Sequence, residues 1–187
     1  MHHHRYLRAI VLIVPFVLLP AGSGCARTKA ESPVLIVTPW EGRLQSLFDD
    51  SIDPASIGLA PTTTDPADAN VARGQAAHFV VRTRVTTITV DGAGPSRRYL
   101  LTLDVVGAPI VGPTPENDVL NLVVGIDSPS FGLVQSKDIG LAGTRFVAFV
   151  RNFEERDGSS FHWHLARDTD DVVSAARKGA ALEPIAD

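Results

Sequence analysis

The feature that most narrows the folds open to this chain is an alternation of apolar and polar residues over residues 98–106. The apolar residues that share one side of this pattern are Tyr99, Leu101, Leu103 and Val105. A half-buried β-strand produces a period of two, whereas a helix spaces its apolar residues three and four apart. The segment is therefore predicted to be a strand with one face in a core.

A longer strand pattern, rich in Val, Thr, Ile and Phe, precedes it at residues 78–90. The apolar parity that begins at Phe79 is reversed at Ile88 and Val90. A β-bulge produces such a change of phase, and bulges bend strands around barrels. Because residues 91–95 read Asp-Gly-Ala-Gly-Pro, a turn signal, the two strands are predicted to form a hairpin.

Three more strands are predicted at residues 119–126, 144–153 and 161–165, the last two joined by a charged turn at 154–160. The first of them is apolar on both faces, which favours a central place in the sheet. The last is expected to turn three residues into the core: Phe161, Trp163 and Leu165.

The segment before these strands carries different signals. Residues 34–37 are predicted to be a short strand that is stopped by Pro39. Residues 43–52 have the apolar spacing of an amphipathic helix. A turn-rich loop at 60–70 follows, and then a helical stretch to Ala77.

The C-terminal part is predicted to contain a loop at residues 128–140, with a short strand at 131–134, and a closing helix. Asp168 or Thr169 can cap that helix, and Gly179 is expected at the position just past its end.

Together these patterns predict a mainly β fold: a small antiparallel barrel of five or six strands with a C-terminal helix, preceded by a short helical N-terminal segment. Residues 34–76 form that N-terminal strand, helix and loop segment, and residues 77–187 form the barrel domain with its helix.

Residues 77–182 resemble the netrin-like, OB-type barrel modules of secreted and surface proteins in the order of their elements. Gly143 precedes an aromatic-rich strand, as is common in bacterial members. The chain lacks the cysteines of the animal netrin modules, so their inhibitory and ligand-binding roles are not carried over. The resemblance implies a fold only.

The N-terminus has the three parts of a secretory signal. Two arginines precede an uncharged apolar run at residues 9–19, and small or turn-forming residues follow at 20–24. A transmembrane helix needs about 20 apolar residues. This run is about half as long and contains Pro15, so residues 1–24 are predicted to be a cleaved signal peptide.

Residues 21–25 resemble the bacterial lipobox, in which small residues precede a cysteine that is lipidated. The resemblance implies that Cys25 carries the lipid and that residues 25–33 tether the protein to the membrane. Gly22 stands where the family has an aliphatic residue, so an ordinary cut after Ser23 or Ala26 is the alternative. Since Ala26 is not aspartate, the same resemblance implies the outer membrane, with the domain facing the periplasm or the cell surface.

Cys25 is the only cysteine, so the exported domain has no internal disulfide. Removal of residues 1–24 lowers Lys plus Arg from 17 to 15 against 21 acidic residues, and the net charge from −4 to −6. This charge argues against nucleic acid as a partner. The expected partners are the membrane, through the lipid on Cys25, and an envelope protein or cell-wall component.

His162 and His164 are the best candidates for chemistry, because residues two apart on a strand share a face. They could bind a metal with Asp168, Asp170 or His78. Alternatively they lie on a solvent-facing surface, and then replacing both with alanine should change stability by no more than about 1 kcal/mol.

No nucleophile motif or dinucleotide loop is present, and the adjacent acids Asp49 and Asp50 are predicted to be solvated surface or helix-end charge. Trp40 is expected to pack over a barrel end or to form part of a contact surface. The functional hypothesis is a non-catalytic envelope lipoprotein, a binding or structural module without a cofactor. The alternative is a metal-binding protein or metal-dependent enzyme that uses His162 and His164.

Overall fold

The computed structural model describes residues 38–60, 68–155 and 158–182, and seven strands in that part of the chain form one sheet. The strands are β1 (Thr38–Pro39), β2 (Ser51–Ile52), β3 (Phe79–Asp91), β4 (Arg98–Val105), β5 (Val119–Val124), β6 (Arg145–Glu155) and β7 (Gly158–Arg167). Their order is β2-β7-β6-β3-β4-β5, and β1 pairs with β6 outside that path. The five long strands are antiparallel to their neighbours, whereas β1 and β2 are short parallel additions.

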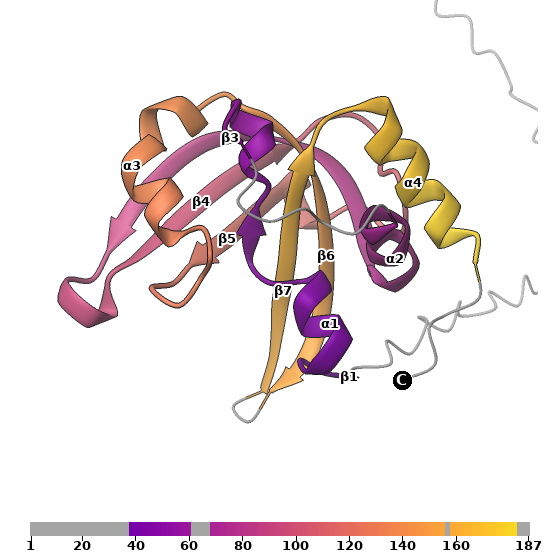
Figure 1. Ribbon diagram of the computed structural model, residues 1–187, viewed down its shortest axis with the longest axis horizontal. Helices are drawn as coiled ribbons and strands as arrows, with labels where there is room; N and C mark the ends of the chain where they lie inside the picture. Colours follow the sequence, from indigo (N-terminus) through magenta and orange to yellow (C-terminus); the bar gives the residue numbers. More distant parts are fainter. Residues whose placement is uncertain (1–37, 61–67, 156–157, 183–187) are drawn as a thin grey trace, which may run out of the picture. The chain divides into compact units, whose positions relative to one another are not determined.

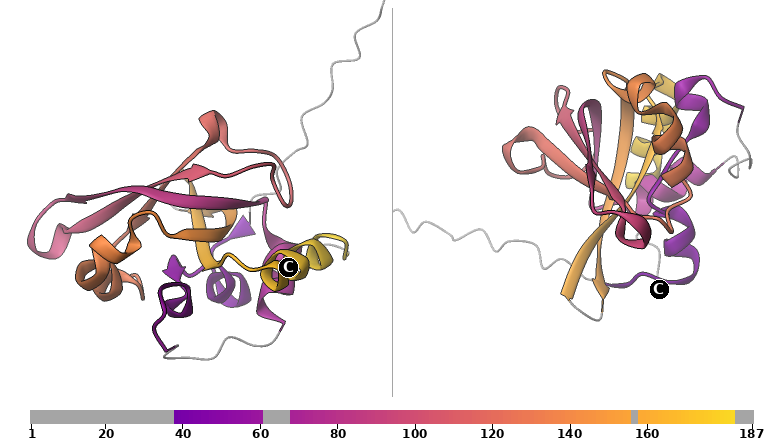
Figure 2. Two further views of the ribbon diagram at one scale, coloured as in Figure 1. Left: turned by 90° about the horizontal axis from the view of Figure 1, so that it is seen from above. Right: turned by 90° about the vertical axis from the view of Figure 1, so that its left-hand side faces the viewer.

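The sheet curls into a half-barrel, as Figures 1 and 2 show. Its outermost strands, β2 and β5, are neighbours of β7 and β4 respectively and do not pair with each other. The prediction of a mainly β fold with one curled antiparallel sheet is therefore confirmed. The described strands do not complete a hydrogen-bonded ring.

The long strand β3 produces much of the curl because it changes partners along its length. It pairs with β6 from Phe79 to Arg84 and with β4 from Thr83 to Asp91. The register with β4 shifts between Val85 and Thr87, which confirms the predicted bulge and hairpin.

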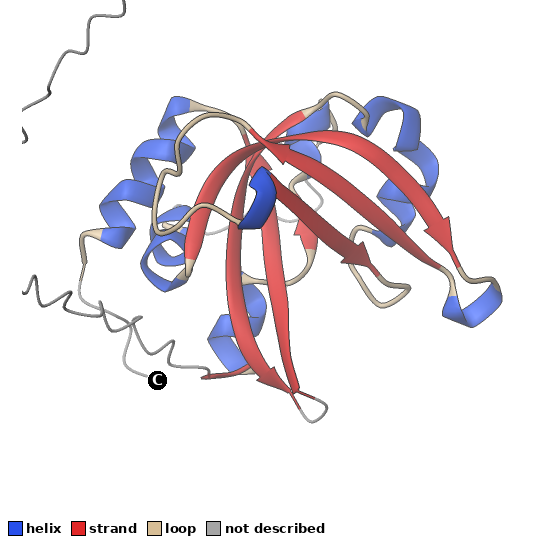
Figure 3. Cartoon of the chain, turned by 180° about the vertical axis from the view of Figure 1, so that it is seen from behind, coloured by secondary structure: helices blue, strands red, loops and turns tan. Residues whose placement is uncertain are grey.

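Helices lie on both sides of the sheet (Figure 3). They are α1 (Gly42–Leu47), α2 (Ala69–Ala76), α3 (Phe131–Leu141) and α4 (Asp170–Ala180), with short 3₁₀ turns η1 (Pro54–Ile57), η2 (Gly94–Ser96) and η3 (Glu116–Asp118). Helices α1, α2 and α4 pack on the convex face of β6 and β7, while α3 packs on the concave face. The closing helix is confirmed, with the side chain of Thr169 accepting from the amide of Val172.

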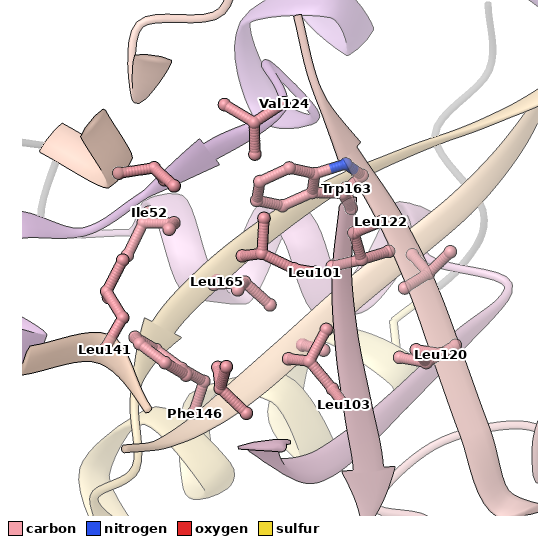
Figure 4. Packing of buried hydrophobic residues seen from close by; sticks show 14 of the residues in the cluster. Ile52, Leu101, Leu103, Leu120, Leu122, Val124, Leu141, Phe146, Trp163 and Leu165 are labelled. Atoms are coloured by element: carbon pink, nitrogen blue, oxygen red, sulfur yellow. The ribbon is translucent and has the colours of Figure 1, made fainter. Parts of the chain in front are cut away.

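The concave face holds the larger core, in which Trp163, Leu101 and Leu103 are nearly or fully buried (Figure 4). The alternation of β4 produces this burial directly, as predicted. The convex core is formed by side chains of β3, β6 and β7 that point away from the concave core, together with α1 and the residue after it, α2 and α4: Leu44, Leu47, Phe48, Ala72, Ala76, Val80, Val147, Phe149, Phe153, Ala166, Val173 and Ala176.

The N-terminal segment is less helical than its sequence predicts. The helix predicted over 43–52 ends at Leu47, because Asp50 adopts a positive φ of 53° and Ser51–Ile52 pairs with β7 as β2. The strand predicted at 34–37 lies outside the described residues, and β1 ends at Pro39.

Three predictions for the later strands and loops were wrong. Residues 128–140 are not a loop, because α3 forms there and buries Val134 and Leu141. Strand β5 is at an edge of the sheet, so its outward Val123 is 45% exposed. Phe161 shares the face of Trp163 but is 61% exposed, because it lies in the first half of β7, before the residues that the concave core covers.

Gly179 was predicted just past the end of the closing helix, but it lies inside α4 and is buried against α2. A Cβ at Gly179 would collide with the backbone carbonyl oxygen of Val71. The missing side chain is what lets the two helices approach so closely.

We therefore expect Gly179→Ala to destabilise the fold by about 1–3 kcal/mol, because the helices must separate. Gly140 in α3 is the matched control, since a Cβ there meets nothing within 4 Å. Gly140→Ala should leave the free energy of unfolding unchanged or raise it slightly. Urea unfolding of both variants measures the difference, and equal stabilities would refute this account of the α2–α4 contact.

Candidate functional site

The two predicted histidines lie on β7 and face α1 and β2. His162 is 8% exposed and His164 is 4% exposed. Both point away from Trp163, as the alternation predicted. The prediction that this face is open to solvent was wrong, because residues 40–52 cover it.

His162 lies between two carboxylates. Its Nδ1 is 2.8 Å from Oδ2 of Asp50, and its Nε2 is 2.9 Å from Oε1 of Glu155. The other carboxylate oxygen of Asp50 accepts a hydrogen bond of 3.1 Å from the amide of Trp163. A protonated imidazole satisfies both carboxylates, since each of its nitrogens then donates.

Trp40 stacks on the imidazole of His162, with ring centroids 3.6 Å apart and planes 10° from parallel. Its indole nitrogen donates to the carbonyl of Phe48 at 2.8 Å. The rings of Phe153 and His162 pack edge to face, with their centroids 5.5 Å apart. Trp40 therefore packs on the convex side of β7 rather than over a barrel end, and it holds His162 in a fixed plane.

His164 joins a second polar group one step along the strand. Its Nδ1 is 3.1 Å from both Oδ1 of Asp49 and Oγ of Ser51. The Ser51 hydroxyl also donates to Asp49 at 2.6 Å. Burial raises the pKa of Asp49, but the hydrogen bond and charge of His164, with Ser51 and Arg73, outweigh it and hold the pKa below its usual value.

Asp49 and Asp50 were predicted to be solvated surface, and this was wrong. They hold the chain between α1 and β2 against β7, where the amide of Asp50 also donates to the carbonyl of Trp163 at 2.9 Å. In the sequence they appear only as an acidic pair after an amphipathic run. Their histidine partners lie far away in the sequence and come close only when the sheet forms.

The residues proposed to complete a metal site lie apart from this cluster. Asp168 binds Arg82 at 2.8 Å and Arg145 at 3.1 Å, and Asp170 also binds Arg82. Nδ1 of His78 accepts from the amide of Asn152. In the part of the chain that the structure describes, no three His, Cys, Asp or Glu side chains are arranged to hold a metal ion.

The cluster has some of the residues of an acyl-transfer site, because Ser160 Oγ lies 3.2 Å from Nε2 of His162 and Asp50 lies beyond Nδ1. A general base must be free to take the serine proton through that nitrogen. Here Glu155 contacts Nε2 at a shorter distance, 2.9 Å. The arrangement therefore suits a structural role better than catalysis by Ser160. We call the contacts of Asp49 and Asp50 with His164 and His162, which hold the N-terminal segment against β7, the ionic lock.

This lock should make stability depend on pH. Burial lowers the pKa of His162, but hydrogen bonds and charges from Asp50 and Glu155 outweigh it, and the pKa rises above the ordinary histidine value of 6.5. The protonated histidine thus stabilises the fold fully below the pKa of the unfolded chain, and this stabilisation is lost as pH rises through the raised pKa of the folded chain.

Unfolding of the parent chain and of His162→Phe at about pH 6 and about pH 9 measures the effect. Phenylalanine keeps a ring against Trp40 but cannot titrate. We expect the stability difference between the two chains to shrink at the higher pH. A constant difference would show that His162 is neutral in the fold.

A separate feature is a cavity of about 460 Å³ on the concave face, here called the edge cavity. Its lining residues are Phe79, Pro113, Thr114, Pro115, Glu116, Asn117, Val119, Leu120, Asn121, Leu122, Val150 and Phe161. Buried apolar side chains form its floor, and the exposed ring of Phe161 stands at its side. The cavity was not predicted from the sequence, because the alternation in β7 placed Phe161 in the core.

Comparison with protein-family models, with curated proteins and with solved structures gave no match to this chain. No helix within the described residues is long and apolar enough to cross a membrane. Cys25, the predicted lipidation site, lies outside those residues.

Proposed function

We propose that this chain is a non-catalytic, lipid-anchored module of the bacterial cell envelope that binds its partner in the edge cavity. The observation that carries the binding role is the cavity itself. Its volume falls within the range of about 300–1,000 Å³ that is usual for ligand sites. Its floor is apolar, and one large aromatic side chain beside it is left exposed.

The exposure of Phe161 supports this role because the rest of its strand face is covered. Trp163 and Leu165, two and four residues further along β7, are 2% and 0% exposed. Aromatic side chains, including phenylalanine, are enriched at the centres of protein interfaces, so an exposed one beside a cavity suits contact with a partner.

The anchor in this proposal is the lipid on Cys25, supported by the lipobox-like residues 21–25. The residue after it is Ala26, which favours the outer membrane. A net charge of −6 without residues 1–24 leaves lipid chains, rather than charge attraction, to hold the protein at an anionic membrane.

We also propose that the half-barrel is an opened member of the small netrin-like, OB-type barrels. Support comes from the long bent strand β3, which pairs with both β4 and β6, and from the helix that follows the last strand.

The binding role is tested with Nile red, a neutral apolar dye, titrated against the mature chain carrying Cys25→Ser. We expect saturable binding that Phe161→Ala weakens about tenfold, since losing about 1.4 kcal/mol of contact has that effect. The control is Ile139→Ala on α3, because Ile139 is 88% exposed and lies outside the cavity. Equal dye binding by the parent chain and Phe161→Ala would refute the assignment.

A further inference from the structure

We infer that the partner of the edge cavity is an extended polypeptide segment with basic ends, which adds to the sheet as a strand along the free edge of β5. This inference rests on the proposed binding role of the cavity and names the class of partner.

The free edge is the first support. β5 (Val119–Val124) pairs with β4 and has no strand on its other side among the described residues. Proteins usually blunt such edges with lysine, proline or a bulge within the strand. The sequence VLNLVV contains no lysine or proline, and its pairing with β4 has no register shift. Its unpaired backbone groups suit the addition of another strand.

The position of the cavity is the second support. Four consecutive residues of β5, from Val119 to Leu122, line it. Consecutive residues point to opposite faces of a strand, so the cavity borders the edge of β5 as well as one face. A strand added there would direct every second side chain toward the cavity floor, on the same side as Leu120 and Leu122. Apolar residues at alternate positions of the partner would therefore fill the cavity.

Charge is the third support and selects among occupants. Glu116 and Asp118 precede β5, Asp127 follows it, and all three are exposed. A segment with Lys or Arg at its ends complements both ends of this edge. A second copy of the chain does not, since antiparallel pairing of two β5 strands would bring the acids of one copy toward those of the other.

The test uses a fluorescent heptapeptide, Lys-Val-Thr-Leu-Thr-Val-Lys, titrated by anisotropy against the mature Cys25→Ser chain. An added strand forms hydrogen bonds with β5 through one of its two edges, and the amide N–H groups of alternate peptide residues point to that edge. N-methylation of a peptide residue, which removes its N–H donor, should therefore weaken binding only at alternate residues. We expect methylation of one parity to abolish binding and methylation of the other to leave it. Equal effects of the two parities, or no peptide binding, would overturn the inference.

Variants of the protein test the charge argument. Asp118→Asn combined with Asp127→Asn, at the two ends of β5 and outside the cavity lining, should weaken binding of this peptide about tenfold and leave Nile red binding unchanged. Asparagine suits position 118, whose φ of 55° is positive. The matched control is Asp171→Asn, an exposed acid on α4, which should bind the peptide as the parent does. Equal peptide binding by the double variant and the control would overturn the charge argument.

The outcomes separate the two proposals. If the chain binds Nile red but not the peptide, only the strand inference is overturned. Binding of a soluble cell-wall oligosaccharide in place of the peptide would overturn it as well. A dimer in sedimentation that Phe161→Ala dissolves would identify a second copy as the occupant, which also overturns it. If neither Nile red nor the peptide binds, the proposed binding role of the edge cavity is itself refuted.

Discussion

Replacement of Trp163 by alanine should lower the free energy of unfolding by about 3–5 kcal/mol. The side chain is 2% exposed and packs in the concave core, where Figure 4 shows it beside Leu101 and Leu165. Truncation removes the largest buried side chain of that core and leaves a cavity that the curled sheet cannot readily close.

Phe161→Ala is the matched control for this loss. Phe161 lies on the same strand and the same face, but it is 61% exposed. Its truncation should change stability by no more than about 0.5 kcal/mol. Urea unfolding followed by circular dichroism compares the two, and similar losses would contradict the assignment of Phe161 to a binding surface.

The second large effect concerns the histidines. We expect His162→Ala combined with His164→Ala to cost about 3 kcal/mol or more, because carboxylates at a largely buried site lose their hydrogen-bond partners. Asp50 loses its contact at 2.8 Å and Asp49 its contact at 3.1 Å. This replaces the expectation of no more than about 1 kcal/mol that follows from a solvent-facing strand.

Restoration tests the cause of that loss. Adding Asp49→Asn and Asp50→Asn to the double alanine variant removes the unpaired charges and should recover part of the stability. No recovery, measured by the same unfolding experiment, would assign the loss to packing against Trp40 instead.

The five long strands of this fold could be predicted because their signals are local. The alternation at Tyr99, Leu101 and Leu103, and the phase change after Val85, reflect burial and bulging within one strand. Helix α4 was recognisable from its cap at Thr169 and its charges at either end. Each of these features is written in residues that are close together in sequence.

Three of the features that were missed depend on distant partners. β5 is apolar on both faces, and only the strand order shows that it lies at an edge. Phe161 continues the pattern of Trp163, yet the end of the sheet leaves it exposed. The contact of Asp50 with His162 joins residues more than one hundred positions apart, so no local pattern announces it.

The lock between β7 and residues 40–52 has a consequence for an anchored protein. The segment that His162 and Trp40 hold is the described part of the chain nearest to Cys25. If Cys25 carries the proposed lipid, a pull exerted from the membrane reaches the sheet first through β1, α1 and β2. The pairing of β1 with β6 and of β2 with β7, together with the amide hydrogen bonds of Asp50 and Asp53 to β7, holds the domain together at that point.

The central claim, that lipid on Cys25 holds this protein at the membrane, is tested most directly by metabolic labelling with a palmitate analogue. We expect the parent protein to carry the label and to sediment with membranes. We expect Cys25→Ser to carry none and to leave the membrane fraction. Label retained after Cys25→Ser, or a parent protein that stays unlabelled and soluble, would contradict the account.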